Sequence, residues 1–150
     1  EEQKVRTVAS ELNVLGSNFH MYPSVPKKDM PDILAAADVA LSLFVDLKPM
    51  WANSANKFFD ALASGSPVAI NYRGWQAELL EKNGAGIVLP PNDPDEAARR
   101  LGEFVSEEKK LEEAGKAAQK LAEERFSRDL LADQLEKVLV EAVNEHNKDS

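Results

Sequence analysis

The alternation of strand-like runs with helix-like segments constrains this chain more than any other feature. Four such runs occur, at Phe19–Val25, Val39–Phe44, Val68–Ile70 and Ala85–Leu89. The segments between them space their apolar residues with a helical period, so strands alternate with helices. Strands joined through helices pair in parallel, with right-handed crossovers and helices on both faces of the sheet. The sequence therefore predicts an α/β fold with a Rossmann-like parallel sheet. Val39–Phe44 is nearly all apolar, as expected for a strand that is covered on both faces.

The last third of the chain is predicted to be helical. Asp93 suits a helix N-cap, Pro94 the first helical position and Glu96 the acid of a capping box. Ser127 suits the cap of a final helix that turns its apolar residues inward. We expect the fold to end in long C-terminal helices whose charged faces are solvated.

These elements suggest a division into two parts. Residues 1–126 form the Rossmann-like domain, and residues 127–150 form a C-terminal helix with a frayed tail. Four strands are few for a doubly wound sheet, and a helix-like segment comes before all of them. We therefore expect the domain to be partial, with one or two leading strands before Glu1.

The composition excludes several classes of function. The chain has 150 residues, with 18 basic and 26 acidic side chains and a net charge of −8, and no basic stripe that would suit a nucleic acid. It has no cysteine, which excludes disulfides and thiolate chemistry, and its two histidines lie far apart, which makes a metal site improbable. No apolar run approaches the roughly 20 residues of a membrane span. We expect a cytoplasmic location.

The ligand site is expected in Trp51–Tyr72, which reads as loop, helix, turn and strand. Ligands of parallel sheets bind where a strand passes into the next helix. Small residues there allow close approach to the backbone, and the free N–H groups of a helix start favour an anion. The candidate binding residues are Asn53, Ser54, Ala55, Asn56 and Lys57. Spacing alone leaves open a plain capped helix with an exposed lysine.

Asp60 lies four residues after Asn56, so the two share a helix face. Its carboxylate can accept hydrogen bonds from the hydroxyls of a ribose, and a solvent-facing aspartate is the alternative. The next strand-to-helix loop, Arg73–Trp75, reaches the same sheet edge, where Trp75 either packs or stacks on a ligand. His20 is expected inside a strand as a buried histidine.

No catalytic residue can be assigned from the sequence. The chain has no recognisable Ser/His/Asp arrangement and no close carboxylate pair of the hydrolase type. The residues alone indicate a nucleotide or phosphate ligand at the edge of a parallel sheet.

Two longer motifs resemble those of a known family. DALASGSPVAI is similar to EAMAxGxPVV, and GAGIVLPPNDPDEAA is similar to G.G.lv.p.dpealA, both found in the C-terminal, donor-binding domain of GT-B glycosyltransferases. More narrowly, the chain resembles the retaining family 4 enzymes that build bacterial surface polysaccharides. The similarity runs from about Phe19 to Phe126.

The resemblance assigns expected roles to the candidate residues. Asp60 takes the place of the second acid of a glutamate pair and holds the ribose, whereas Ala52 stands where the first acid would lie. Within the pattern S-x-N-K-x-F-D, Asn56 and Lys57 lie near the phosphates and sugar, and the backbone from Asn53 to Asn56 contacts the diphosphate or the sugar. Val25 lies in the loop that receives the edge of the base.

The resemblance also implies partners. The donor is a nucleotide-diphosphate sugar of the UDP, GDP or ADP type, and a sugar or lipid-linked acceptor binds through a missing N-terminal domain. The basic residues that grip the donor phosphates are expected before Glu1, so the chain alone should bind nucleotide weakly and be inactive. No cofactor and no metal are expected. Peripheral attachment to the inner membrane would come through the missing domain.

Two alternatives remain beside a donor-binding domain. The first is another GT-B enzyme, such as a nucleotide-sugar 2-epimerase, which would need more carboxylates and histidines than this chain supplies. The second is a non-catalytic module that binds a partner through its C-terminal helices.

Overall fold

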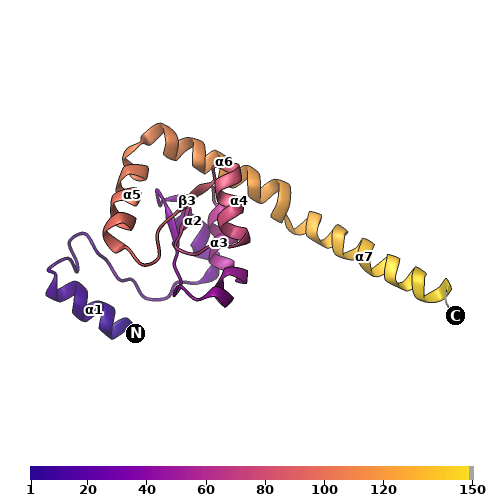
Figure 1. Cartoon of the computed structure of the whole chain (residues 1–150), viewed down its shortest axis with the longest axis horizontal. Helices are drawn as coiled ribbons and strands as arrows, with labels where there is room; N and C mark the ends of the chain where they lie inside the picture. The colour runs from indigo at the N-terminus through magenta and orange to yellow at the C-terminus, as the bar shows by residue number, and fades with distance from the viewer. Residues whose placement is uncertain (149–150) are drawn as a thin grey trace. The chain divides into compact units, whose positions relative to one another are not determined.

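The computed structural model describes residues 1–148, which divide into two compact units, residues 1–30 and the chain from Pro31 onward. The first unit contains α1 (Glu2–Glu11) and a 3₁₀ helix, η1 (Lys27–Asp29). The elements that follow are α2 (Met30–Ala35), β1 (Ala40–Ser42), η2 (Lys48–Ala52, a 3₁₀ helix), α3 (Asn56–Ala63), β2 (Val68–Ile70), α4 (Trp75–Asn83), β3 (Gly86–Val88), α5 (Pro94–Ser106), α6 (Glu108–Phe126) and α7 (Arg128–Lys148) (Figure 1).

The sheet of the second unit has three parallel strands in the order β1-β2-β3. Ala40, Val68 and Gly86 lie side by side at the amino end, so all three strands point the same way. All residues of β2 are fully buried, which means that both faces of the central strand are covered. The predicted α/β fold with a parallel sheet and long C-terminal helices is confirmed.

The core joins the sheet to α3, α4 and α6. Phe58 and Leu62 of α3 are fully buried, and α3 packs along α6, which contributes Ala118 and Leu121. Short loops at the carboxyl ends of the strands lead from β1 to η2 and α3, from β2 to α4, and from β3 to α5 (Figure 1). The three loops that follow the strands therefore lie along the same edge of the sheet, at the carboxyl ends of the strands.

The expectation that Val39–Phe44 is covered on both faces is wrong. Ser42 is buried, but Leu41 and Leu43 on the other face are 48% and 47% exposed. β1 is an edge strand of this sheet, and α3 packs against it. In α2, Leu34 packs against the core, whereas Ile33 is exposed.

The strand expected at Phe19–Val25 does not form in the described structure. The first unit holds only an isolated bridge between Leu15 and Phe19, followed by irregular chain. His20 is exposed, with Nε2 3.2 Å from the carbonyl oxygen of Ser17, so it is not a buried strand residue. A strand requires a neighbouring strand to satisfy its backbone groups, and this unit supplies none beyond that bridge.

The local signals at helix ends are largely confirmed. The Asp93 carboxylate accepts a hydrogen bond from the Glu96 N–H at 3.0 Å, and Pro94 begins α5. The Glu96 carboxylate does not close a capping box, because it binds Arg99 and Arg100 instead. Ser127 Oγ accepts from the N–H of Leu130 at the start of α7, as expected.

α7 differs from its expected packing. Its apolar residues were expected to face inward, yet the stripe is about half exposed in the described structure. The exposed members are Leu131, Leu135, Val138, Leu139 and Val143. The tail expected to fray is Glu145–Ser150; residues 145–148 are instead the last turn of α7, and the remainder lies outside the described residues. The division at residue 126 stays a prediction. Among the described helices, none combines the length and the apolar character needed to cross a membrane.

Candidate functional site

The loop before α3 is held by hydrogen bonds of Asn53. Its backbone N–H and its Nδ2 both donate to the carbonyl of Met50, at 3.1 and 2.6 Å, and its Oδ1 accepts from the N–H of Ala55 at 3.3 Å. The Asn53 carbonyl accepts from the indole Nε1 of Trp75 at 3.1 Å. All polar groups of Asn53 are therefore used, which gives this residue a structural role in shaping the loop.

The first turn of α3 has no side-chain cap. Ala55 occupies the N-cap position in an extended conformation and has no polar side chain, and no acid lies in the first turn. The N–H of Phe58 reaches the Ala55 carbonyl, but the N–H groups of Ser54, Asn56 and Lys57 have no hydrogen-bond partner among residues 1–148. These three N–H groups stay available for an anion at the positive end of the helix dipole.

Lys57 supplies a cation next to these N–H groups. Its Nζ lies 4.7 Å from the centre of the Phe44 ring, and it forms no ion pair with any described residue. Phe44 in turn packs edge-on against the buried Tyr72, with ring centroids 5.3 Å apart. The ammonium group therefore rests on an aromatic face at the carboxyl end of β1 and keeps its charge free for a phosphate.

Asp60 lies one turn further along α3, half-buried, on the same helix face as the exposed Asn56. Within the described part of the chain, its carboxylate has no hydrogen-bond or ion-pair partner. A carboxylate so placed can accept hydrogen bonds from hydroxyl groups of a ligand whose phosphates lie at the helix start. The structure thus brings together on one short helix the acid, the cation and the free N–H groups that the sequence singled out.

Asn71 shapes the edge of the sheet beside this helix. Its Oδ1 accepts from the N–H of Phe44 at 2.8 Å, and its Nδ2 donates to the Phe44 carbonyl at 2.9 Å. The side chain thereby continues the pairing of β1 and β2 beyond their last residues and fixes Phe44, on which Lys57 rests. The sequence analysis missed Asn71; its signal was an asparagine placed directly after a buried strand.

Gly74 allows the starts of α3 and α4 to approach each other. Its φ is +97°, and a Cβ at this position would lie 2.3 Å from the carbonyl oxygen of Trp51. Only glycine adopts this conformation without strain and leaves room for the Trp51 backbone. Trp75 then stacks on Phe59, with ring centroids 6.1 Å apart and planes 25° apart. The question left open by the sequence is thus answered: Trp75 packs against protein.

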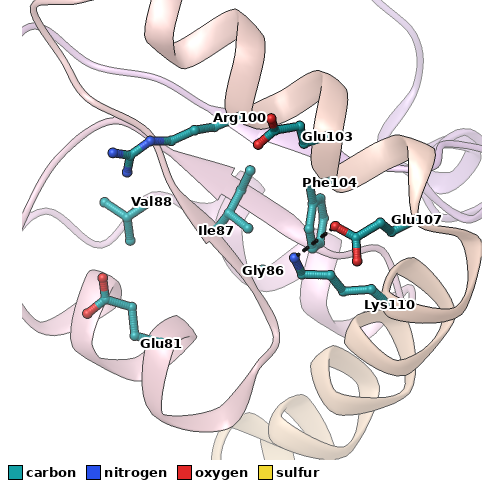
Figure 2. A pocket seen from close by; sticks show the side chains of 9 residues that line it. All are labelled: Glu81, Gly86, Ile87, Val88, Arg100, Glu103, Phe104, Glu107 and Lys110. Atoms are coloured by element: carbon teal, nitrogen blue, oxygen red, sulfur yellow. Dashed lines mark hydrogen bonds and ion pairs between the residues drawn. The ribbon is translucent and has the colours of Figure 1, made fainter.

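A hollow of about 520 Å³ adjoins this site at the carboxyl ends of β2 and β3. Trp51, Arg73 and Glu78 line it, and Arg73 has no ion-pair partner among the described residues. A second hollow, of about 300 Å³, lies beside β3 and is drawn in Figure 2. Its charged residues are mostly paired, as Lys110 is with Glu107, and no loop at the carboxyl ends of the strands lines it, so it is the weaker candidate.

The remaining predicted residue, Val25, belongs to the first unit, and its contact with a base stays a prediction. Among residues 1–148, no group of three or more potential ligands could hold a metal ion. The described site also contains no nucleophile beside a general base. What it offers is recognition of a ligand that carries a phosphate and hydroxyl groups.

The fold and the candidate site define a class of protein, an α/β domain with a candidate ligand site at the carboxyl edge of a parallel sheet. The family profile described as "Glycosyl transferase-like" matches residues 3–137. The chain therefore belongs to the glycosyl transferase-like family. Among curated proteins, it is 28% identical over 112 residues to spore coat protein SA of Bacillus subtilis (strain 168), a match that covers 74% of this chain and 29% of that protein.

Two solved structures share the fold. Sucrose-phosphate synthase from Thermosynechococcus elongatus superposes with a TM-score of 0.80 at 16% identity, over 95% of this chain and 34% of that one. HepE from Anabaena, solved in complex with UDP and glucose, gives a TM-score of 0.77 at 20% identity, over 93% of this chain and 36% of that one. The chain spans about a third of the length of these proteins.

Proposed function

We propose that this chain is the donor-binding part of a glycosyltransferase that uses a nucleotide-diphosphate sugar. The observation that carries the proposal is the start of α3. Three N–H groups, Lys57 and the Asp60 carboxylate lie there within two helical turns, and none of them has a hydrogen-bond or ion-pair partner among residues 1–148. Membership of the glycosyl transferase-like family supports it. UDP is the preferred candidate nucleotide, because HepE, which shares the fold, was solved with UDP and with UDP-glucose.

In this proposal the diphosphate lies at the start of α3, and the ribose reaches Asp60. During transfer, the anomeric C–O bond breaks and its electron pair leaves with the nucleoside diphosphate. The α3 N–H groups and Lys57 stabilise the charge that develops on this leaving group. The oxygen of an acceptor hydroxyl forms the new bond to the anomeric carbon, and its proton passes to the departing diphosphate. Transfer with retention follows from the resemblance to family 4 enzymes, and NMR of the product anomer tests it.

The ribose role of Asp60 can be tested with a matched pair of ligands. In the full-length protein, Asp60→Ala should weaken UDP binding in calorimetry by about 10- to 100-fold, the value of hydrogen bonds to a charged group. 2′-Deoxy-UDP should bind the wild type more weakly than UDP, but Asp60→Ala should bind both alike. Asp95→Ala, which removes an exposed acid at the start of α5, is the control and should leave binding unchanged.

A wild-type protein that binds none of UDP, GDP or ADP would refute the proposed function. Equal losses for UDP and 2′-deoxy-UDP in Asp60→Ala would refute only the ribose role. NMR of the sugar product separates transfer from 2-epimerisation. The wider proposal, assembly of bacterial surface polysaccharide in the cytoplasm with peripheral membrane attachment, is tested by sugar analysis of a deletion strain and by cell fractionation.

A partner-binding role through α7 is the second candidate. It is favoured by the apolar stripe of α7, whose Leu135 and Val138 are 60% and 61% exposed. Such a stripe requires a covering surface, which a partner or the remainder of the protein can supply. If Leu135→Glu abolished a complex in the full-length protein while wild-type protein bound no nucleotide, this role would replace the first.

A further inference from the structure

Trp75 ties the loop before α3 to the hydrophobic core. It is the first residue of α4, and its side chain is 37% exposed. The indole Nε1 donates to the Asn53 carbonyl at 3.1 Å. The ring stacks on Phe59 and meets the fully buried Phe58 edge-on, with centroids 6.1 and 6.2 Å away. One side chain thus connects α4, the core side of α3 and the loop that begins α3.

We propose that Trp75 is a positioning residue for the donor diphosphate. It holds the Asn53 carbonyl, and through it the chain from Asn53 to Ala55, in the conformation that leaves the α3 N–H groups free. The inference rests on the proposed function and deepens it, because it names a residue that acts on the phosphates without touching them.

The hydrogen bonds of Asn53 explain why the indole matters. Three of its four bonds run to Met50 or Ala55, so they shape the loop internally. Among the hydrogen bonds of Asn53 in the described chain, the one from Trp75 joins it to an element distant in the sequence, α4. Without it the loop keeps its internal turn but loses its connection to α4. The loop then keeps the contact of Trp51 with Gly74 but loses the hydrogen bond that fixes the Asn53 carbonyl.

The surroundings fix the indole in place. The Gly74 backbone lies against the Trp51 carbonyl, which sets the start of α4 next to η2. Phe126, at the end of α6, packs edge-on against Phe59 with ring centroids 5.0 Å apart. A phenylalanine at position 75 could provide the same ring packing. Tryptophan adds the indole N–H, which donates the hydrogen bond.

The test compares UDP with uridine in the full-length protein. Trp75→Phe keeps an aromatic ring and removes the donor, so the Kd for UDP should rise about fivefold, the factor that one neutral hydrogen bond is worth. The Kd for uridine, measured by competition, should stay within about twofold, because base and ribose contacts do not involve this loop. Trp75→Leu, which also lacks the N–H, should show the same selective loss for UDP.

Val68→Ala is the matched control. Val68 is fully buried at the amino end of β2, the sheet edge opposite the site, so this variant lowers the melting temperature without reaching the loop. It should bind UDP and uridine as the wild type does. Unchanged UDP binding in Trp75→Phe, or equal losses for UDP and uridine, would overturn the inference while leaving the proposed function standing. Failure of the wild type to bind UDP would overturn both.

Discussion

The helices α3 and α5 begin in opposite ways. α5 starts with Asp93, whose carboxylate caps the N–H of Glu96, and Glu96 forms ion pairs with Arg99 and Arg100. At the start of α3, Ala55 provides no side-chain cap, and Lys57 is a cation at the positive end of the helix that forms no ion pair within the described chain. Both helices lie on the carboxyl side of a strand of the same sheet, α3 after β1 and η2 and α5 directly after β3, and their first turns differ in the residues that could cap them.

The start of α5 is stabilised by its cap, whereas the start of α3 leaves its N–H groups open for a ligand. A side-chain cap is worth about 0.5–2 kcal/mol, and acids in the first turn add to it. α3 forgoes both, and its first N–H groups remain without partners in the described structure. Such losses are typical of binding sites, where stability is exchanged for function. The following predictions exchange features between the two helices.

The largest effect is expected when α3 receives the cap of α5. Ala55→Asp places a carboxylate at the N-cap, where it bonds the N–H groups that are now free and repels a phosphate. The free energy of unfolding should rise by about 1 kcal/mol, and UDP binding should fall at least about tenfold. Denaturant titration and calorimetry measure the two quantities.

The control for this exchange is Ala98→Asp, which adds the same charge at an exposed position within α5. It should leave UDP binding unchanged. If Ala55→Asp bound UDP as tightly as the wild type, the start of α3 would not be the phosphate site.

A smaller effect is expected when α5 loses its cap. Asp93→Ala leaves the Glu96 N–H without its partner, so the free energy of unfolding should fall by about 1 kcal/mol, with no change in UDP affinity. Urea denaturation followed by circular dichroism measures the loss, and Asp95→Ala, at the next position but one, is the matched control. A change in UDP affinity in Asp93→Ala would show that the two helix starts are not functionally distinct.

The smallest effect concerns the ion pairs behind the α5 cap. Hydrogen bonds from Arg99 and then Arg100 lower the pKa of Glu96 from 4.5 to about 2. Because the folded-state pKa is depressed, this carboxylate stabilises the fold above pH 4.5, and the contribution is lost as the pH falls toward 2. Glu96→Gln should therefore melt slightly below the wild type at pH 7, by a small margin since the pairs are exposed.

Melting curves recorded from pH 7 to pH 2 measure this dependence. The gap between wild type and Glu96→Gln should close between pH 4.5 and 2. A gap that stays constant over this range would mean that the ion pairs contribute nothing and that the Asp93 cap alone sets the stability of the α5 start.

The predictions from sequence are confirmed for helix starts, which depend on residues close together in the chain, and for the strand whose residues are all apolar. Asp93 and Pro94 begin α5 as expected because a cap depends on residues only three apart. The buried run Val68–Ile70 became the central strand. Phe19–Val25 failed for the opposite reason, since a strand also needs a partner that its own residues cannot specify. The burial expected for Leu41 and for the apolar residues of α7 also fails, because burial depends on which elements pack beside a residue.

The sequence by itself determined the α/β class, the start of α5 and the segment from Asn53 to Asp60 that carries the candidate site, because composition, caps and spacing act over a few residues. Tertiary structure decided how that segment is held. Asn71 reaches Phe44 across 27 positions of the chain, and Trp75 reaches Asn53 across 22. Such contacts form only after the sheet has brought its loops to one edge, so they cannot be predicted from the pattern of residues in a short stretch of sequence.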